Sequence, residues 1–201
     1  QRQMCIRDSL STMLKGLKLH THNITAVVTV ADDGGSSGIL RSDLGMLAPG
    51  DVRNCVSALA EVDPVMGELL NFRFKDGSLK GHSLGNLFLA ALNETSSSFD
   101  EAVKKFSHLT GVVGTVYPVT NESVTLSALL EDGRLIEGES HIGVHHDGPK
   151  NGIVKLMVNP EKPKAVDGVI KALEKADIIV LGPGSLYTSI IPCLLYTSDA
   201  A

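Results

Sequence analysis

The residues best suited to chemistry lie in one run, Asp-Asp-Gly-Gly-Ser-Ser-Gly at positions 32–38. This run, called here the acidic glycine loop, follows an apolar, β-branched stretch at 24–31 and precedes a predicted helix near Ile39. Free backbone N–H groups and serine hydroxyls at the start of a helix can bind an anion. The members of the loop, all candidate ligand contacts, are Asp32, Asp33, Gly34, Gly35, Ser36, Ser37 and Gly38.

The two carboxylates of this loop fit either of two tasks. Asp32 and Asp33 can accept hydrogen bonds from ribose hydroxyls, as an acidic residue does in dinucleotide-binding folds. They can instead hold Mg²⁺ together with the phosphates of a ligand. An ordinary helix-capping turn uses similar residues, but turns seldom need so many small ones. We therefore favour a ligand-binding loop.

A second candidate is Gly81-His82-Ser83-Leu84-Gly85, which fits the G-x-S-x-G pattern of serine hydrolases. That pattern needs a buried strand directly before the serine, whereas residues 73–80 are polar and turn-like. We favour a small-residue turn that opens a helix over 84–92, with His82, Ser83 and Asn86 free to contact a ligand. A hydrolase that uses Ser83 remains a remote alternative.

A third candidate follows the apolar stretch Ile178–Leu181, which we expect to be a buried strand. Gly182, Gly184 and Ser185 come directly after it and repeat the order of strand and glycine loop. This order predicts a second contact to an anion or a ribose. A purely structural turn explains the same residues equally well.

Alternating strands and helices predict an α/β fold with a largely parallel sheet, which binds ligands at the carboxyl ends of its strands. Within it, Ser98 is expected to cap a helix, as is Asp51. Residues 112–160 form a β-rich excursion with a hairpin turn at 131–134. The helices are expected at 10–19, 52–60, 66–74, 84–92, 99–109 and 166–176.

Composition narrows the class of protein. The 201 residues carry a formal net charge of −5 and 4% aromatic side chains, which argues against nucleic acid as a partner. No apolar run is long enough for a membrane span. Three cysteines without pairing spacing and the lack of a visible signal peptide predict a cytoplasmic protein.

The two ends of the sequence look foreign to the rest. The chain opens with Gln1 rather than Met, and Leu-Tyr-Thr-Ser at 186–189 recurs at 195–198. We expect one α/β domain over 10–192 that is truncated at both ends. Residues 1–9 and 193–201 are expected to be non-native sequence.

Five segments in order resemble one family, the gluconeogenesis factors (YvcK-like), within the superfamily of 2-phospho-L-lactate transferases (CofD-like). The segments are ADDGGSSGILR at 31–41, PGDVRN at 49–54, GHSLGN at 81–86, VTNESVTL at 119–126 and LGPGSLYTSIIP at 181–192. The resemblance implies a Rossmann-like three-layer sandwich that binds a nucleotide-containing ligand, an NAD-like dinucleotide or a UDP-sugar.

The resemblance also implies a role. Members of this branch are treated as cytoplasmic bacterial regulators, needed for growth and cell shape on gluconeogenic carbon sources, rather than as enzymes with an established reaction. The transferase branch instead joins a phospholactate-type group to a deazaflavin, in coenzyme F420 biosynthesis, with Mg²⁺. In that alternative Asp32 and Asp33 would be metal ligands. Self-association as a homo-oligomer is a further implication.

Carried over by position, the resemblance adds a cleft around the acidic glycine loop. Asp51, Arg53 and Asn54 would line it, with Arg53 as the fixed positive charge for a phosphate. The family begins with a strand and a Gly-Gly-Gly-Thr-Gly loop, whose place is taken here by the foreign-looking residues before Leu10. It also continues beyond Pro192.

Overall fold

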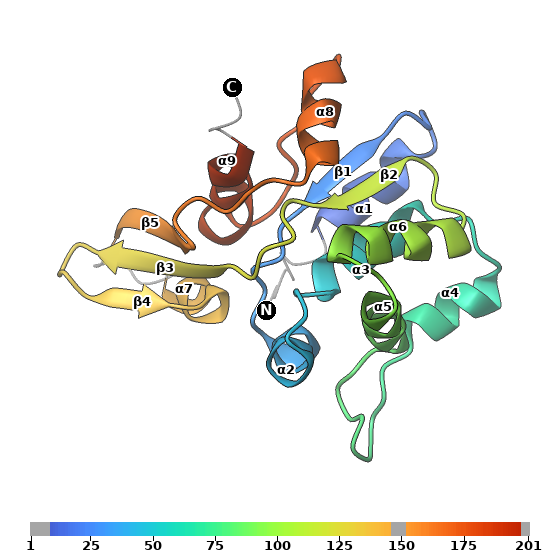
Figure 1. Cartoon of the computed structure of the whole chain (residues 1–201), viewed down its shortest axis with the longest axis horizontal. Helices are drawn as coiled ribbons and strands as arrows, with labels where there is room; N and C mark the ends of the chain where they lie inside the picture. The colour runs from blue at the N-terminus through green and yellow to red at the C-terminus, as the bar shows by residue number, and fades with distance from the viewer. Residues whose placement is uncertain (1–8, 146–151, 198–201) are drawn as a thin grey trace, which may run out of the picture.

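The computed structural model describes residues 9–145 and 152–197, and it forms an α/β fold with a parallel strand pair and a separate antiparallel sheet (Figure 1). In chain order the elements are α1 (Ser9–Leu17), β1 (Thr25–Val28), α2 (Gly35–Leu44), α3 (Gly50–Leu59), α4 (Pro64–Asn71), α5 (Leu84–Glu94), α6 (Phe99–Leu109), β2 (Thr115–Pro118), β3 (Thr125–Leu130), β4 (Leu135–Glu137), α7 (Glu139–His145), β5 (Ile153–Asn159), α8 (Asp167–Lys175), the π-helix η2 (Leu186–Ile190) and α9 (Ile191–Thr197).

Strands β1 and β2 run parallel, from Thr25 opposite Thr115 to Val28 opposite Pro118. The long crossover between them contains α2 to α6, and α3 packs against both strands. Figure 1 shows these helices gathered on one side of the pair. Val52, Val56 and Leu59 of α3 are fully buried there, because a parallel pair is stable only when helices cover its faces.

The antiparallel sheet has the order β4-β3-β5 and lies apart from the parallel pair (Figure 1). The hairpin turn predicted at 131–134 joins β3 to β4, as expected. Alternate residues of β3 point inward, and Leu126 and Ala128 are fully buried. Helix α7 covers β3 and β4 and buries Ile142. The predicted β-rich excursion over 112–160 therefore contributes to both sheets. Its first strand, β2, pairs with β1, and its other strands, β3, β4 and β5, form the antiparallel sheet.

Of the two helix caps that the sequence predicts, Ser98 is confirmed, because its hydroxyl accepts a hydrogen bond from the N–H of Glu101. Ser83, which was expected to be free to contact a ligand, instead caps α5 by accepting the N–H of Asn86. The prediction for Asp51 was wrong. Pro49 occupies the cap position of α3, so Asp51 falls within the first turn, where its charge still favours the helix N-terminus.

The expected buried strand over Ile178–Leu181 was also wrong. The sheets of the described residues do not include this segment, and its side chains are 59% to 80% exposed. An apolar β-branched run becomes a strand only where a neighbouring strand can take its backbone hydrogen bonds.

None of the helices in residues 9–145 and 152–197 has the length and apolar content needed to cross a membrane.

Candidate functional site

The acidic glycine loop leaves the carboxyl end of β1 and turns directly into α2. Helix α2 begins at Gly35, earlier than predicted, so Ser36 and Ser37 lie in its first turn and are buried. The Asp32 carboxylate, on a residue only 9% exposed, accepts the N–H of Gly34. The loop therefore brings a carboxylate and a free helix N-terminus to the same place.

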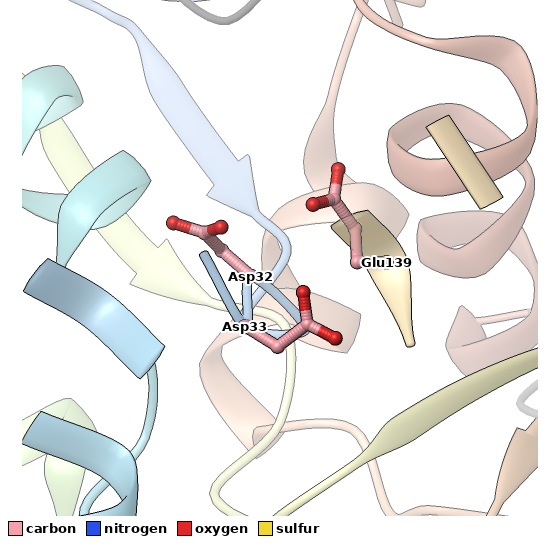
Figure 2. Close-up of side chains that lie close together, drawn as sticks. All are labelled: Asp32, Asp33 and Glu139. Atoms are coloured by element: carbon pink, nitrogen blue, oxygen red, sulfur yellow. The ribbon is translucent and has the colours of Figure 1, made fainter. Parts of the chain in front are cut away.

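Asp33 connects this loop to the antiparallel sheet. Its Oδ1 accepts the N–H of Ser140 at 2.9 Å, in the first turn of α7. Glu139, the first residue of α7, brings a third carboxylate: one oxygen each of Asp32, Asp33 and Glu139 lie within 4.8 Å of one another (Figure 2). The sequence prediction missed Glu139, because nothing in its local pattern places it beside β1.

Two glycines permit these close contacts. A Cβ on Gly38 would stand 2.1 Å from the backbone oxygen of Asp33, so α2 can pack on the loop only without a side chain there. Gly138 has φ +95°, and a Cβ on it would lie 2.5 Å from Asp33 Oδ2. Both positions require glycine where the chain approaches Asp33.

A buried hydrogen-bond network joins α2, α3 and α5 behind the loop. Ser36 Oγ lies 3.0 Å from Nδ1 of His82 and accepts Nδ2–H of Asn86 at 3.2 Å. Arg53 Nε donates to Oδ1 of the same Asn86, and Arg53 Nη1 donates to Asn71. Ser36, Arg53, His82 and Asn86 are each less than 10% exposed. The structure thus brings together four predicted site residues and adds Asn71.

Ser83 has a structural role in this geometry. Its side chain is fully buried, and its hydroxyl caps α5 by accepting the N–H of Asn86. The preceding segment is a turn that makes one isolated bridge, between Arg73 and Ser83, in place of the buried strand that a hydrolase elbow requires. This arrangement argues against Ser83 as a nucleophile.

The remaining predicted residues lie on α3 and in the glycine loop at 182–185. Asn54 is half-buried on α3. A Cβ on Gly182 would meet Leu10 of α1 at 2.9 Å, and one on Gly184 would meet the Cβ of Ser189 at 3.2 Å. Ser185 caps η2 by accepting the N–H of Thr188, and η2 packs against α7. The second glycine loop therefore leads directly into η2, which packs against the helix that carries Glu139.

Burial, with the nearby Asp51 carboxylate, raises the pKa of the Cys55 thiol to about 12. The same two causes raise the pKa of Cys193 to about 12. Both thiols are therefore protonated at neutral pH. This argues against either thiol as a nucleophile, because the thiolate is the reactive form.

Comparison with known proteins places this chain in a family. The family model described as 2-phospho-L-lactate transferase CofD matches residues 8–198. The chain belongs to the CofD family. This agrees with the resemblance found in the five sequence segments, and it accounts for the α/β fold.

Members of the CofD family include proteins similar to this chain over nearly its whole length. A relative from Thermoanaerobacterium thermosulfurigenes is 57% identical over 92% of the chain. The gluconeogenesis factor of Bacillus subtilis is 47% identical over 92% of the chain. A crystal structure of a Bacillus halodurans protein superposes with a TM-score of 0.88 at 45% identity and covers 93% of the chain. The chain spans 58% to 59% of the length of these three relatives.

Proposed function

We propose that this chain is the nucleotide-binding part of a gluconeogenesis factor, a regulator in the bacterial cytoplasm. Its ligand would be an NAD-like dinucleotide or a UDP-sugar. Its role would be to support growth and cell shape on gluconeogenic carbon sources. The observation that carries the proposal is the buried network around Ser36, which supports the first turn of α2 at the carboxyl end of a parallel strand.

The chemistry of that network suits a phosphate-containing ligand. The first turn of a helix presents unpaired N–H groups and a partial positive charge. Arg53 adds a full positive charge close by, and its guanidinium is held by two asparagine oxygens. A buried positive charge favours an anion nearby, because the low local dielectric strengthens the attraction. Ribose hydroxyls would find acceptors in Asp32 and Asp33.

The test is thermal unfolding of the chain with NAD⁺ and, separately, with UDP-glucose. A ligand at 100 times its Kd adds about 2.7 kcal/mol of stability, and for this chain length that raises Tm by roughly 5–10 °C. We expect such a shift with one of the two ligands. Asp33→Asn should reduce the shift, and Asp43→Asn, an exposed aspartate on α2, should not. No shift with either ligand would refute the proposal.

A second candidate function is a Mg²⁺-dependent transferase of the phospholactate type, and the three carboxylates favour it. Asp32, Asp33 and Glu139 offer oxygen ligands close together, the donor type that Mg²⁺ prefers. Bound there, Mg²⁺ would neutralise charge on a transferring phosphate group. Asp32 is held in place by the N–H of Gly34, and Asp33 by the N–H of Ser140.

The transferase candidate is tested with a deazaflavin acceptor and a phospholactate-type donor. Turnover that requires Mg²⁺ and disappears in Asp33→Asn would support it. Absence of both turnover and Mg²⁺ binding, measured by titration calorimetry, would remove it. Self-association is proposed for either function, and sedimentation velocity over a concentration series would detect it.

A further inference from the structure

The hydrogen bonds around Ser36 can be followed donor by donor, beginning at Arg53. A guanidinium only donates hydrogen bonds, so the 3.3 Å contact from Arg53 Nε fixes which end of the Asn86 amide is the oxygen. The other end, Nδ2, then faces Ser36 Oγ at 3.2 Å and must donate to it. Arg53 therefore determines that Ser36 accepts a hydrogen bond from Asn86.

Ser36 has one hydrogen to donate and two lone pairs, one of which Asn86 occupies. The remaining partner is Nδ1 of His82 at 3.0 Å. If Nδ1 lacks a hydrogen, Ser36 donates to it and has no hydrogen left for a ligand. If Nδ1 carries a hydrogen, it donates to the second lone pair, and the Ser36 hydrogen must point in the one remaining direction.

We propose that His82 carries its hydrogen on Nδ1 in the ligand-bound protein, and so directs the hydroxyl of Ser36 at an anionic oxygen of the ligand. His82 and Asn86 are then positioning residues, which act on the ligand through Ser36. The inference rests on the proposed nucleotide binding and names the group that contacts the phosphate. It replaces the expectation that His82 and Asn86 touch the ligand themselves.

The placement of Ser36 supports this arrangement. It lies in the first turn of α2, where unpaired N–H groups and the helix dipole already favour an anion. The residue is 8% exposed, so its hydroxyl has little access to water. When His82 donates through Nδ1, the Ser36 hydroxyl hydrogen has no acceptor in the network, and a ligand oxygen at the helix N-terminus would supply one.

The opposite state of His82 predicts different chemistry. A hydrogen on Nε2 alone would make Nδ1 an acceptor for the Ser36 hydroxyl. That is the arrangement of a serine with its general base, and it predicts a reactive nucleophile. The two states differ in the position of one hydrogen, which spectroscopy can observe directly.

The first experiment is ¹⁵N NMR of the histidine rings in the whole chain, with saturating UDP-glucose or NAD⁺. His82 is assigned by comparison with His82→Asn. We expect a protonated Nδ1 in the complex. An unprotonated Nδ1 in the complex, or covalent labelling of Ser36 by a fluorophosphonate, would overturn the inference. A purely structural histidine would show no dependence of its ring signals on the ligand.

The second experiment measures affinity for the same nucleotide in matched variants. Ser36→Ala should weaken binding about 10- to 100-fold, because a hydrogen bond to a charged group is lost. Ser42→Ala, an exposed serine on the same helix, should not. His82→Asn should bind about as tightly as the wild type, since an amide N–H can replace Nδ1–H.

A non-polar substitution shows whether His82 acts through Ser36. His82→Leu, similar in size to Asn, should weaken binding about 3- to 10-fold. That loss should vanish in the Ser36→Ala background, because the two residues form one unit. Additive losses would overturn the inference while leaving nucleotide binding intact. A wild-type chain that binds neither nucleotide would overturn both.

Discussion

Gly38 offers the sharpest test of the loop geometry. A Cβ at this position would lie 2.1 Å from the Asp33 carbonyl oxygen, far inside van der Waals contact. The obstacle is backbone rather than a flexible side chain, so Gly38→Ala must push α2 and the loop apart by about an ångström. Overpacking of this kind costs about 1–3 kcal/mol. Alanine regains about 1 kcal/mol through its better helix propensity, which leaves a net loss of up to about 2 kcal/mol.

Urea unfolding, followed by circular dichroism, measures this loss as a change in the free energy of unfolding. Gly16→Ala is the matched control, because Gly16 is also helical and a Cβ on it would meet nothing within 4 Å. That variant should be as stable as the wild type or more so. Gly38→Ala should also bind nucleotide more weakly, since Asp33 and Ser36 would move apart. A Gly38→Ala protein as stable as Gly16→Ala would refute the close approach.

Three further predictions concern single residues. Arg53→Met keeps most of the side-chain volume but removes the donors to both asparagines. Urea unfolding should show a free energy of unfolding that is lower by about 1–3 kcal/mol. An unchanged unfolding midpoint would show that these hydrogen bonds do not stabilise the fold. Because burial and Asp51 raise the pKa of the Cys55 thiol from 9.0 to about 12, iodoacetamide at neutral pH should leave Cys55 unmodified in the native chain and alkylate it in urea, as peptide mass spectrometry can show. Its contribution to stability is complete below pH 9.0 and should fall between pH 9.0 and about 12, where only the unfolded thiol ionises. In Gly138→Ala, the positive φ at this position would strain the backbone, and the new Cβ would clash with the Asp33 carboxylate. This variant should lower the free energy of unfolding by about 1–3 kcal/mol. An unchanged free energy of unfolding would show that α7 can shift freely.

Local features of the fold could be predicted from the sequence. The cap at Ser98 and the hairpin turn at 131–134 depend on neighbouring residues, which the sequence shows directly. The strand expected at 178–181 depended on a partner strand, and side-chain pattern alone does not supply one. Asp51 failed as a cap because α3 begins at Gly50, with Pro49 at the cap position two residues before Asp51.

The site could be predicted only in part. The acidic glycine loop and the segment 81–86 are recognisable because small and polar residues gather there. Glu139 and Asn71 were missed, since each reaches the site through tertiary packing. A glutamate after a hairpin and an asparagine at a helix end are common surface residues. Only the folded chain shows that they face Asp33 and Arg53.

The hydrogen bond from Ser140 to Asp33 joins residues 107 positions apart in sequence. Through it, the first turn of α7 is tied to the loop that leaves β1, so a local opening of either segment must break the same contact. A ligand that holds the loop should therefore slow amide hydrogen exchange at Ser140, without touching α7. By reciprocity, whatever steadies the antiparallel sheet should tighten binding at the loop by the same factor. Faster exchange at Ser140 in Asp33→Asn, with the rest of α7 unchanged, would show that this carboxylate carries the coupling.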